Sequence, residues 1–277
     1  MGCPLRVSSD MNESPLPAPA TEAIARVGLG ARAFVYFAVA TLLLDSVFTS
    51  KPDDGASPGD AFRAIETQLG GRILLIALAI GLFLYAGWRF QQAALDMDNK
   101  GSDAKGILAR FGMASSGGSY LLLGIAAFTV TLGSNESSSG GGATKSAAQW
   151  MMDQPFGQWA VALGGLILMG IGCAQIWRAK TGHWKDGIDL SGWAGNLTSV
   201  IAFGIGGRGI LFIAVGGFLL LAGISADSSD VRGLAETMGW LRYQPFGLYL
   251  FIASAVAIGL YGLYSAVQTL RYKFPDS

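Results

Sequence analysis

The chain repeats itself, because a shift of 176 residues places a series of glycine, arginine, glutamine and tyrosine residues on identical ones. The matched pairs are Gly28 and Gly204, Gly30 and Gly206, Arg32 and Arg208, Gln68 and Gln244, Gly71 and Gly247, Tyr85 and Tyr261, and Gln92 and Gln268. No gap is needed between Arg32 and Gln92, so two helix-length apolar stretches and the loop joining them keep one length in both copies. Such a repeat constrains the fold more than any other feature of the chain.

A third, more diverged copy lies between these two. A shift of 84 residues places Arg26 on Arg110, and a shift of 86 residues places Gln68 on Gln154. The difference of two residues falls in the Gly- and Ser-rich segment 134–144. Insertions are tolerated best in exposed loops, so the sequence predicts three tandem repeats.

Each repeat contains two apolar segments long enough to cross a membrane. The chain is 51% hydrophobic and only 14% charged, whereas soluble domains carry about 25% charged residues. A spanning helix needs about 20 mainly apolar residues. The segments of this kind are 27–48, 72–90, 112–132, 156–177, 200–223 and 246–268. We therefore expect an all-α polytopic membrane protein with six transmembrane helices, arranged as three tandem two-helix hairpins related by a pseudo-threefold axis along the membrane normal.

The same pattern predicts the organisation along the chain. Residues 1–22 are rich in Pro, Ser and Ala and are expected to form a disordered tail. The three membrane hairpins are expected at 23–95, 107–180 and 199–272.

Lysine and arginine residues predict the orientation of the chain. Eleven of them lie in the N-terminal tail, in the loops after the second and fourth segments and at the C-terminus, against six in the other loops. Cytoplasmic loops carry the excess of positive charge, so both termini are expected in the cytoplasm. The formal net charge is zero, which provides no basic field for nucleic acid, and nucleic acid is not expected as a partner.

A polar layer is expected near the cytoplasmic ends of the helices. Arg32 and Arg208 lie about one to one and a half turns inside apolar segments, where a charge is costly and usually faces protein or water. Gln92 and Gln268 lie at a matching depth on the following segments. The favoured interpretation is a structural clamp of Arg32 with Gln92 and of Arg208 with Gln268, and the alternative is snorkelling to lipid phosphates.

The middle repeat changes this layer but keeps its positive charge. Ser116 stands at the position of the repeated arginine, and Arg178 stands at the position of the repeated glutamine. The charge has moved to the other helix of the hairpin at the same depth. This favours a role for positive charge there, and it also fits drift under the positive-inside rule.

A second candidate site lies on the opposite side of the membrane. Gln154 and Gln244 open the sequence Gln-Pro-Phe-Gly, and Gln68 stands at the same point of the first repeat. Proline is favoured in the first turn of a helix, so the motif indicates a helix start. The alternative is that the three glutamines and three helix N-termini converge on an anion or a polar head group. The polar segments before the motif, 59–70, 145–153 and 231–243, are expected to include short interfacial helices.

Glycine within the apolar segments has two interpretations. Small residues let transmembrane helices approach closely. The alternative is that residues 205–209, Ile-Gly-Gly-Arg-Gly, form an unwound break that lines a substrate site.

Residues for catalysis, cofactor binding or metal binding are not expected. The single histidine, His183, and two cysteines cannot supply the four ligands of a usual zinc site. Paired carboxylates, a nucleophilic triad and a P-loop are lacking from the sequence. We therefore expect no cofactor and no enzymatic activity.

The repeat motifs resemble a known family. Arg26-Val27-Gly28, Gly30-Ala31-Arg32, the repeated Gln-Pro-Phe-Gly and Gly-Leu-Tyr-Gly-Leu-Tyr at 259–264 are similar to the bacterial integral-membrane family filed as domain of unknown function 1206. The resemblance covers about residues 25–272. It implies three tandem two-helix repeats in a bacterial inner membrane, and it implies no mechanism.

Two functions are compatible with this sequence. The first is a non-enzymatic membrane protein that interacts with lipid, with a membrane-protein partner or with itself. The second is a channel or transporter for a small solute, in which the arginine layer favours anions. The two differ in whether Arg32, Arg178 and Arg208 surround one axis or turn outward to head groups.

Overall fold

A computed structural model describes residues 18–48, 58–96, 101, 103–133, 148–186, 188–227 and 230–272. Its six long helices are α1 (Ala18–Phe48), α3 (Gly71–Leu95), α4 (Ala104–Thr131), α6 (Gly157–Thr181), α8 (Thr198–Ser225) and α10 (Gly247–Arg271). Each is long and apolar enough to cross a membrane. The expected all-α fold with six spanning helices is confirmed.

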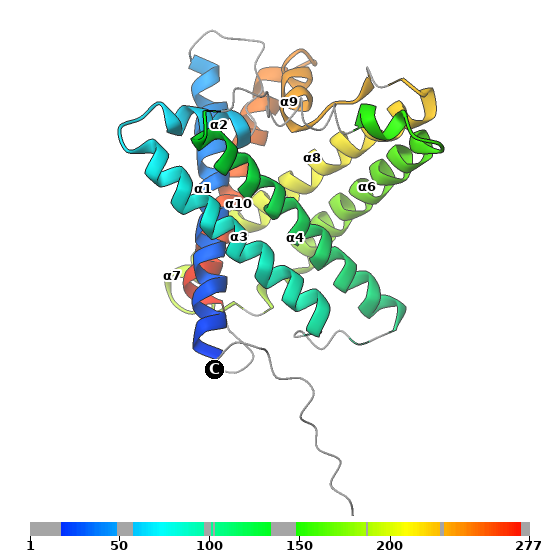
Figure 1. Ribbon diagram of the computed structural model, residues 1–277. Coiled ribbons are helices and arrows are strands. Elements are labelled where there is room, and N and C mark those ends of the chain that lie inside the picture. The colour runs from blue at the N-terminus through cyan, green and yellow to red at the C-terminus, as the bar shows by residue number, and fades with distance from the viewer. Residues whose placement is uncertain are drawn as a thin grey trace, which may run out of the picture.

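The ends of the hairpins carry shorter helices. The first and third repeats place α2 (Pro58–Glu66) and α9 (Leu234–Arg242) before their second long helix, and residues 148–152 are helical in the second. Figure 1 shows α2 and α9 at one end of the bundle, opposite the start of α1 and the end of α10. We call the latter end the terminal face, and it also carries a 3-10 turn (His183–Lys185) and α7 (Trp193–Asn196).

The first helix, α1, begins earlier in the chain than expected. The start of α1 at Ala18 lies inside the segment 1–22 that was expected to be disordered, and the rest of that segment lies outside the described residues. The exact limits expected for the three hairpins stay predictions.

The long helices of each repeat pack mainly against long helices of the other repeats. The most extensive packing joins the first helix of one repeat to the second helix of another: α4 to α3, α8 to α6, and α1 to α10. Figure 1 shows α1 upright with α10 behind it, the tilted pair of α3 and α4 crossing in front, and the tilted pair of α6 and α8 to the right. Because α1 and α10 come from the two ends of the chain, their pairing joins the third repeat back to the first.

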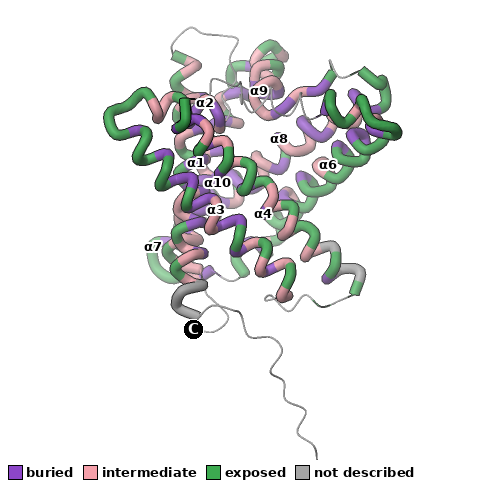
Figure 2. Tube along the Cα trace, in the orientation of Figure 1, coloured by how far each residue is buried: buried purple, intermediate pink, exposed green. Residues whose placement is uncertain are grey.

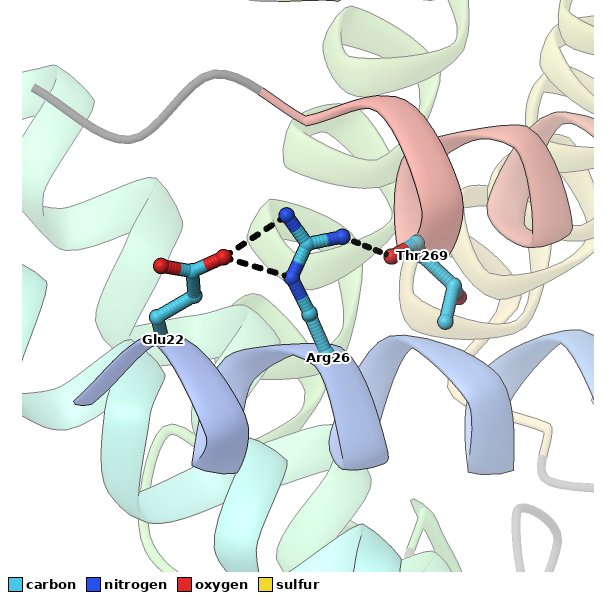
Figure 3. A network of polar contacts seen from close by, with 3 residues as sticks. All are labelled: Glu22, Arg26 and Thr269. Carbon is cyan, nitrogen blue, oxygen red and sulfur yellow. Dashed lines mark hydrogen bonds and ion pairs between the residues drawn. The ribbon is translucent and has the colours of Figure 1, made fainter. Parts of the chain in front are cut away.

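In two of these helix pairs, an arginine at the equivalent repeat position donates a hydrogen bond to a backbone carbonyl at the terminal face. Arg26 of α1 donates from Nη1 to the carbonyl oxygen of Thr269 on α10 at 2.6 Å, and Glu22 holds it from one turn earlier (Figure 3). Arg110 of α4 donates from Nε to the carbonyl oxygen of Ala93 on α3 at 2.6 Å. Arg26 and Arg110 are equivalent in the repeat, and so are Thr269 and Ala93. Equivalent contacts between successive repeats are what a pseudo-threefold arrangement of hairpins produces.

Glycine brings the backbones of α6 and α8 into contact. A Cβ atom on Gly172 would lie 2.5 Å from the carbonyl oxygen of Gly209, and one on Gly209 would lie 2.7 Å from that of Gly172. Gly165 and Gly216 face each other in the same way, at 2.6 and 2.7 Å. Since α8 runs unbroken through residues 205–209, the interpretation as an unwound break is wrong, and close helix packing is confirmed.

The second repeat is more open than the other two. The hairpin helices α1 and α3 pack on each other, and so do α8 and α10, but α4 and α6 do not. Only 28% of the spanning window of α4 and of α6 is buried, against 50% for α1 and α10. In Figure 2, exposed residues run along most of α6. The helices therefore form a ring that is open between α4 and α6.

Candidate functional site

A cavity of about 380 Å³ lies within the ring and is lined by residues of all six long helices. Its most distinctive feature is four arginines from four helices. These are Arg32 on α1, Arg89 on α3, Arg178 on α6 and Arg208 on α8. Among the described residues that line the cavity, none is Asp or Glu. The site therefore concentrates positive charge inside a membrane bundle.

Arg32 is fixed deep in the bundle by three neutral partners. Its side chain donates from Nη2 to Oε1 of Gln268 at 2.6 Å, from Nη1 to the hydroxyl of Tyr85 at 2.8 Å, and from Nε to Oγ of Ser265 at 3.0 Å. Only 4% of the residue is exposed. It lies ten residues after Glu22, where the apolar span begins, which corresponds to about 15 Å along a helix.

Arg208 is held by an amide and by aromatic rings. Its Nη1 donates to Oε1 of Gln175 at 2.8 Å. The guanidinium carbon lies 4.1 Å from the ring centre of Phe212 and 4.4 Å from that of Tyr261. The faces of these rings attract a cation, yet they carry no net negative charge to neutralise it.

Arg89 and Arg178 complete the cationic wall. Arg89 donates from Nε to the hydroxyl of Tyr85 at 3.0 Å and from Nη1 to Oε1 of Gln92 at 2.9 Å. Arg178 lines the cavity from an exposed position near the end of α6. Within the described part of the chain, none of the ion pairs found involves any of the four arginines.

The pairing of the polar layer differs from the expected one. Arg32 was expected to clamp Gln92 of its own repeat, but it binds Gln268 of the third repeat. Arg208 was expected to clamp Gln268, but it binds Gln175 of the second repeat. The reason is that α1 packs along α10 and α8 packs along α6, so each arginine meets the helix of a neighbouring repeat. Arg32 is also too buried to snorkel to lipid phosphates.

The remaining positions of the layer lie around the same cavity. Ser116 lines it from α4 together with Ser115 and Ser119. Gln92 and Gln268 lie outside the described lining, but they accept hydrogen bonds from the lining residues Arg89 and Arg32. The residues of the expected polar layer thus line this cavity or bind the arginines that line it.

Sequence reasoning missed Arg89, Gln175 and Ser265. These three residues occupy one position of the repeat, because shifts of 86 and 176 residues place Arg89 on Gln175 and on Ser265. All three make side-chain hydrogen bonds in the layer. A search for polar residues recurring at one repeat position, even when their types differ, would have found them.

Aromatic pairs repeat around the cavity, with one exception. Tyr36 of α1 packs edge-to-face on Tyr261 of α10, with ring centres 4.8 Å apart, and the equivalent Tyr120 of α4 packs on Tyr85 of α3 at 4.7 Å. The third equivalent pair would join α8 to α6, and those positions are Phe212 and Ile171. The wall formed by α6 therefore lacks the tyrosine hydroxyl that the other repeats provide.

The second candidate site, on the opposite face, has a structural explanation. The carbonyl oxygens of Gln68, Gln154 and Gln244 each accept a hydrogen bond from the glycine three residues later, at 2.9, 2.9 and 2.7 Å. The long helix begins at that glycine, and a Cβ atom there would collide with a backbone carbonyl of the preceding short helix. These turns account for the motif, and a ligand at the three glutamines stays a prediction.

These observations define an all-α polytopic membrane protein in which three tandem hairpins surround a cationic cavity. The family model described as Domain of Unknown Function (DUF1206) matches the chain three times, at residues 27–96, 111–182 and 203–271, and the chain belongs to this family. It is also similar to an uncharacterized protein, YxxB, of Bacillus subtilis (strain 168), with 26% identity over 221 residues that cover 75% of this chain and 76% of the relative. No solved structure matches the chain.

Proposed function

We propose that this protein binds an anionic group, a phosphate or a carboxylate, in the arginine-lined cavity. The observation that carries the proposal is that three of the four arginines, Arg32, Arg89 and Arg208, donate only to neutral groups among the described residues, and that Arg178 lines the same cavity. Taking an ion out of water costs several kcal/mol unless a counter-charge compensates it, and buried charges in membrane proteins are usually paired. An anion supplies the charge that the cavity walls lack.

The side chains around the cavity suit an oxyanion. A guanidinium presents planar N–H donors that match the oxygen atoms of phosphate and carboxylate. The hydroxyls of Ser115, Ser116 and Ser119 add further donors from α4. The volume of about 380 Å³ falls within the range of small-molecule sites.

The proposed role is binding rather than catalysis. The described lining includes serine and tyrosine hydroxyls but no His, Lys, Asp or Glu, which are the side chains that most often act as the general base that activates such a hydroxyl. We further infer a bacterial inner-membrane location with both termini in the cytoplasm, supported by the excess of lysine and arginine on that side. The cavity then lies in the cytoplasmic half of the membrane.

Thermal unfolding of the purified protein in phosphatidylcholine nanodiscs tests the proposal. Sodium phosphate or sodium acetate should raise the unfolding midpoint above that in sodium chloride of equal ionic strength. Arg208→Gln should weaken this effect by about tenfold in apparent affinity, equivalent to about 1.4 kcal/mol. Arg72→Gln is the matched control, because Arg72 is exposed in the first turn of α3 on the face opposite the terminal face. Equal responses of the two variants would contradict the proposal.

Anion transport is a second candidate function. It is favoured by the position of the cavity, which all six helices line around the axis along which a path would run. Proteoliposomes should then pass chloride or small carboxylates, and the double variant Arg32→Gln, Arg208→Gln should abolish the flux. Anion binding without flux would support the binding function and contradict anion transport.

A further inference from the structure

The cavity opens sideways, between α4 and α6. The lining residues that are exposed all belong to these two helices, and they are Gly112, Ser115 and Ser119 on α4 and Ile171 and Arg178 on α6. The lining residues of α1, α3, α8 and α10 are buried or half-buried. Among the described residues, this opening coincides with the hairpin whose two long helices lack the extensive packing found in the other two hairpins.

The opening faces the hydrocarbon of one leaflet. The apolar span of α4 begins at Ala109. Ser115 and Ser119 lie six and ten residues further on, which corresponds to about 9 and 15 Å along the helix. The hydrocarbon core is about 30 Å thick, so the opening runs from the interface at the terminal face to about the middle of the bilayer.

The walls of the opening change character with depth. Arg178 lies three residues before the end of α6, and it shares the outer part of the cavity with the hydroxyl of Ser115. About ten residues into the spans the lining still includes Ser119, Arg32 and Arg208, with Ile171 of α6 at the same level. Further in, α4 and α6 contribute the apolar residues Leu123 and Leu168. A cationic, hydroxyl-bearing part followed by an apolar part matches a molecule with an anionic head and a hydrocarbon tail.

We propose that the ligand of the cavity is an anionic phospholipid that enters between α4 and α6 from the leaflet at the terminal face. This inference rests on the proposed function, since it names the source of the bound anion. The lipid phosphate passes Arg178 and lies near Arg208, while an acyl chain lies along Leu123 and Leu168. A lipid also fills the gap between two helices that no described side chains close.

The test uses the full-length protein in nanodiscs of phosphatidylcholine alone or of phosphatidylcholine with phosphatidylglycerol. Retained lipid is measured by native mass spectrometry, and binding by the shift of the unfolding midpoint. We expect phosphatidylglycerol to be retained in preference to phosphatidylcholine. Arg178→Gln should reduce this retention about tenfold, as expected for the loss of one charged contact, whereas Arg72→Gln should leave it unchanged.

A bulky residue in the opening tests the route. Ser119→Trp should abolish retention of phosphatidylglycerol by filling the gap beside Ile171. Leu121→Trp is the matched control, because Leu121 is exposed on α4 but lies about 200° around the helix from Ser119 and outside the described lining of the cavity. Equal retention in both tryptophan variants would overturn lateral access.

Inorganic phosphate added to phosphatidylcholine nanodiscs separates this inference from the proposed function. If phosphate raises the unfolding midpoint and phosphatidylglycerol is not retained, the lipid is the wrong ligand and anion binding stands. If neither phosphate nor phosphatidylglycerol binds, both proposals fall. Equal retention of phosphatidylcholine and phosphatidylglycerol would show that the net charge of the lipid does not determine binding, and it would overturn the inference.

Discussion

Replacing Gly172 with alanine should damage both stability and anion binding. The added Cβ atom would lie 2.5 Å from the carbonyl oxygen of Gly209 and 2.8 Å from Cγ1 of Ile213. Ordinary carbon–oxygen contacts are about 3.3–3.6 Å, so α6 and α8 must separate locally by roughly 1 Å. Overpacking of this kind costs about 1–3 kcal/mol.

The displacement should also reach the cavity. Gln175 lies three residues after Gly172, and its Oε1 accepts from Nη1 of Arg208 at 2.8 Å. A separation of roughly 1 Å would stretch that distance beyond the 2.7–3.2 Å that hydrogen bonds of this type require. We therefore expect the affinity for phosphate to fall together with the stability.

The assay is equilibrium unfolding in mixed micelles with increasing dodecyl sulfate, followed by the fluorescence of the seven tryptophans. The matched control is Gly170→Ala on the same helix, because a Cβ atom on Gly170 would have no neighbour within 4 Å. Gly170→Ala should be neutral or stabilising by up to about 1 kcal/mol, since alanine is the better helix former. If Gly172→Ala and Gly170→Ala unfold at the same midpoint, the contact between the two backbones has been misjudged.

Three further perturbations are informative. Tyr85→Phe removes the hydroxyl that accepts from two cavity arginines, and it should cost about 1–3 kcal/mol of unfolding free energy, whereas Tyr249→Phe, at a residue 73% exposed, should cost almost nothing in the same titration. Gly247→Ala forces a side chain against the backbone of the preceding turn and should lower the thermal midpoint, and an unchanged midpoint would contradict the structural explanation of the glutamine motif. In a background without native cysteines, Arg63→Cys should react with an impermeant thiol reagent on intact cells and Lys185→Cys should not, and the reverse pattern would invert the proposed orientation.

The divergence of the second repeat bears on function. Its first helix has Ser116 where the other repeats have arginine, and its second helix has Ile171 where they have tyrosine. Both residues line the cavity, and both changes remove a long polar side chain from the wall beside the opening. A ring with three equivalent hairpins would have three similar walls, whereas this one has a distinct side between α4 and α6.

Local sequence was sufficient for the elements and for the residues that share one polar level, but it placed Arg32 and Arg208 too near the helix ends, since both lie ten residues inside their apolar spans. A segment of about 20 apolar residues has one stable arrangement in lipid, a helix with its backbone hydrogen bonds satisfied internally. The repeat offset also places Ser116 and Arg178 at the same level as the repeated arginines and glutamines.

The partners of those residues were decided only by the tertiary structure. A residue's depth along a helix follows from its position in the chain, but the helix that it faces depends on how all six helices pack. Because the first helix of each repeat lies along the second helix of a neighbouring repeat, Arg32 binds Gln268 rather than Gln92. The same packing leaves α4 and α6 apart, and that gap depends on contacts between distant segments that no local pattern of residues encodes.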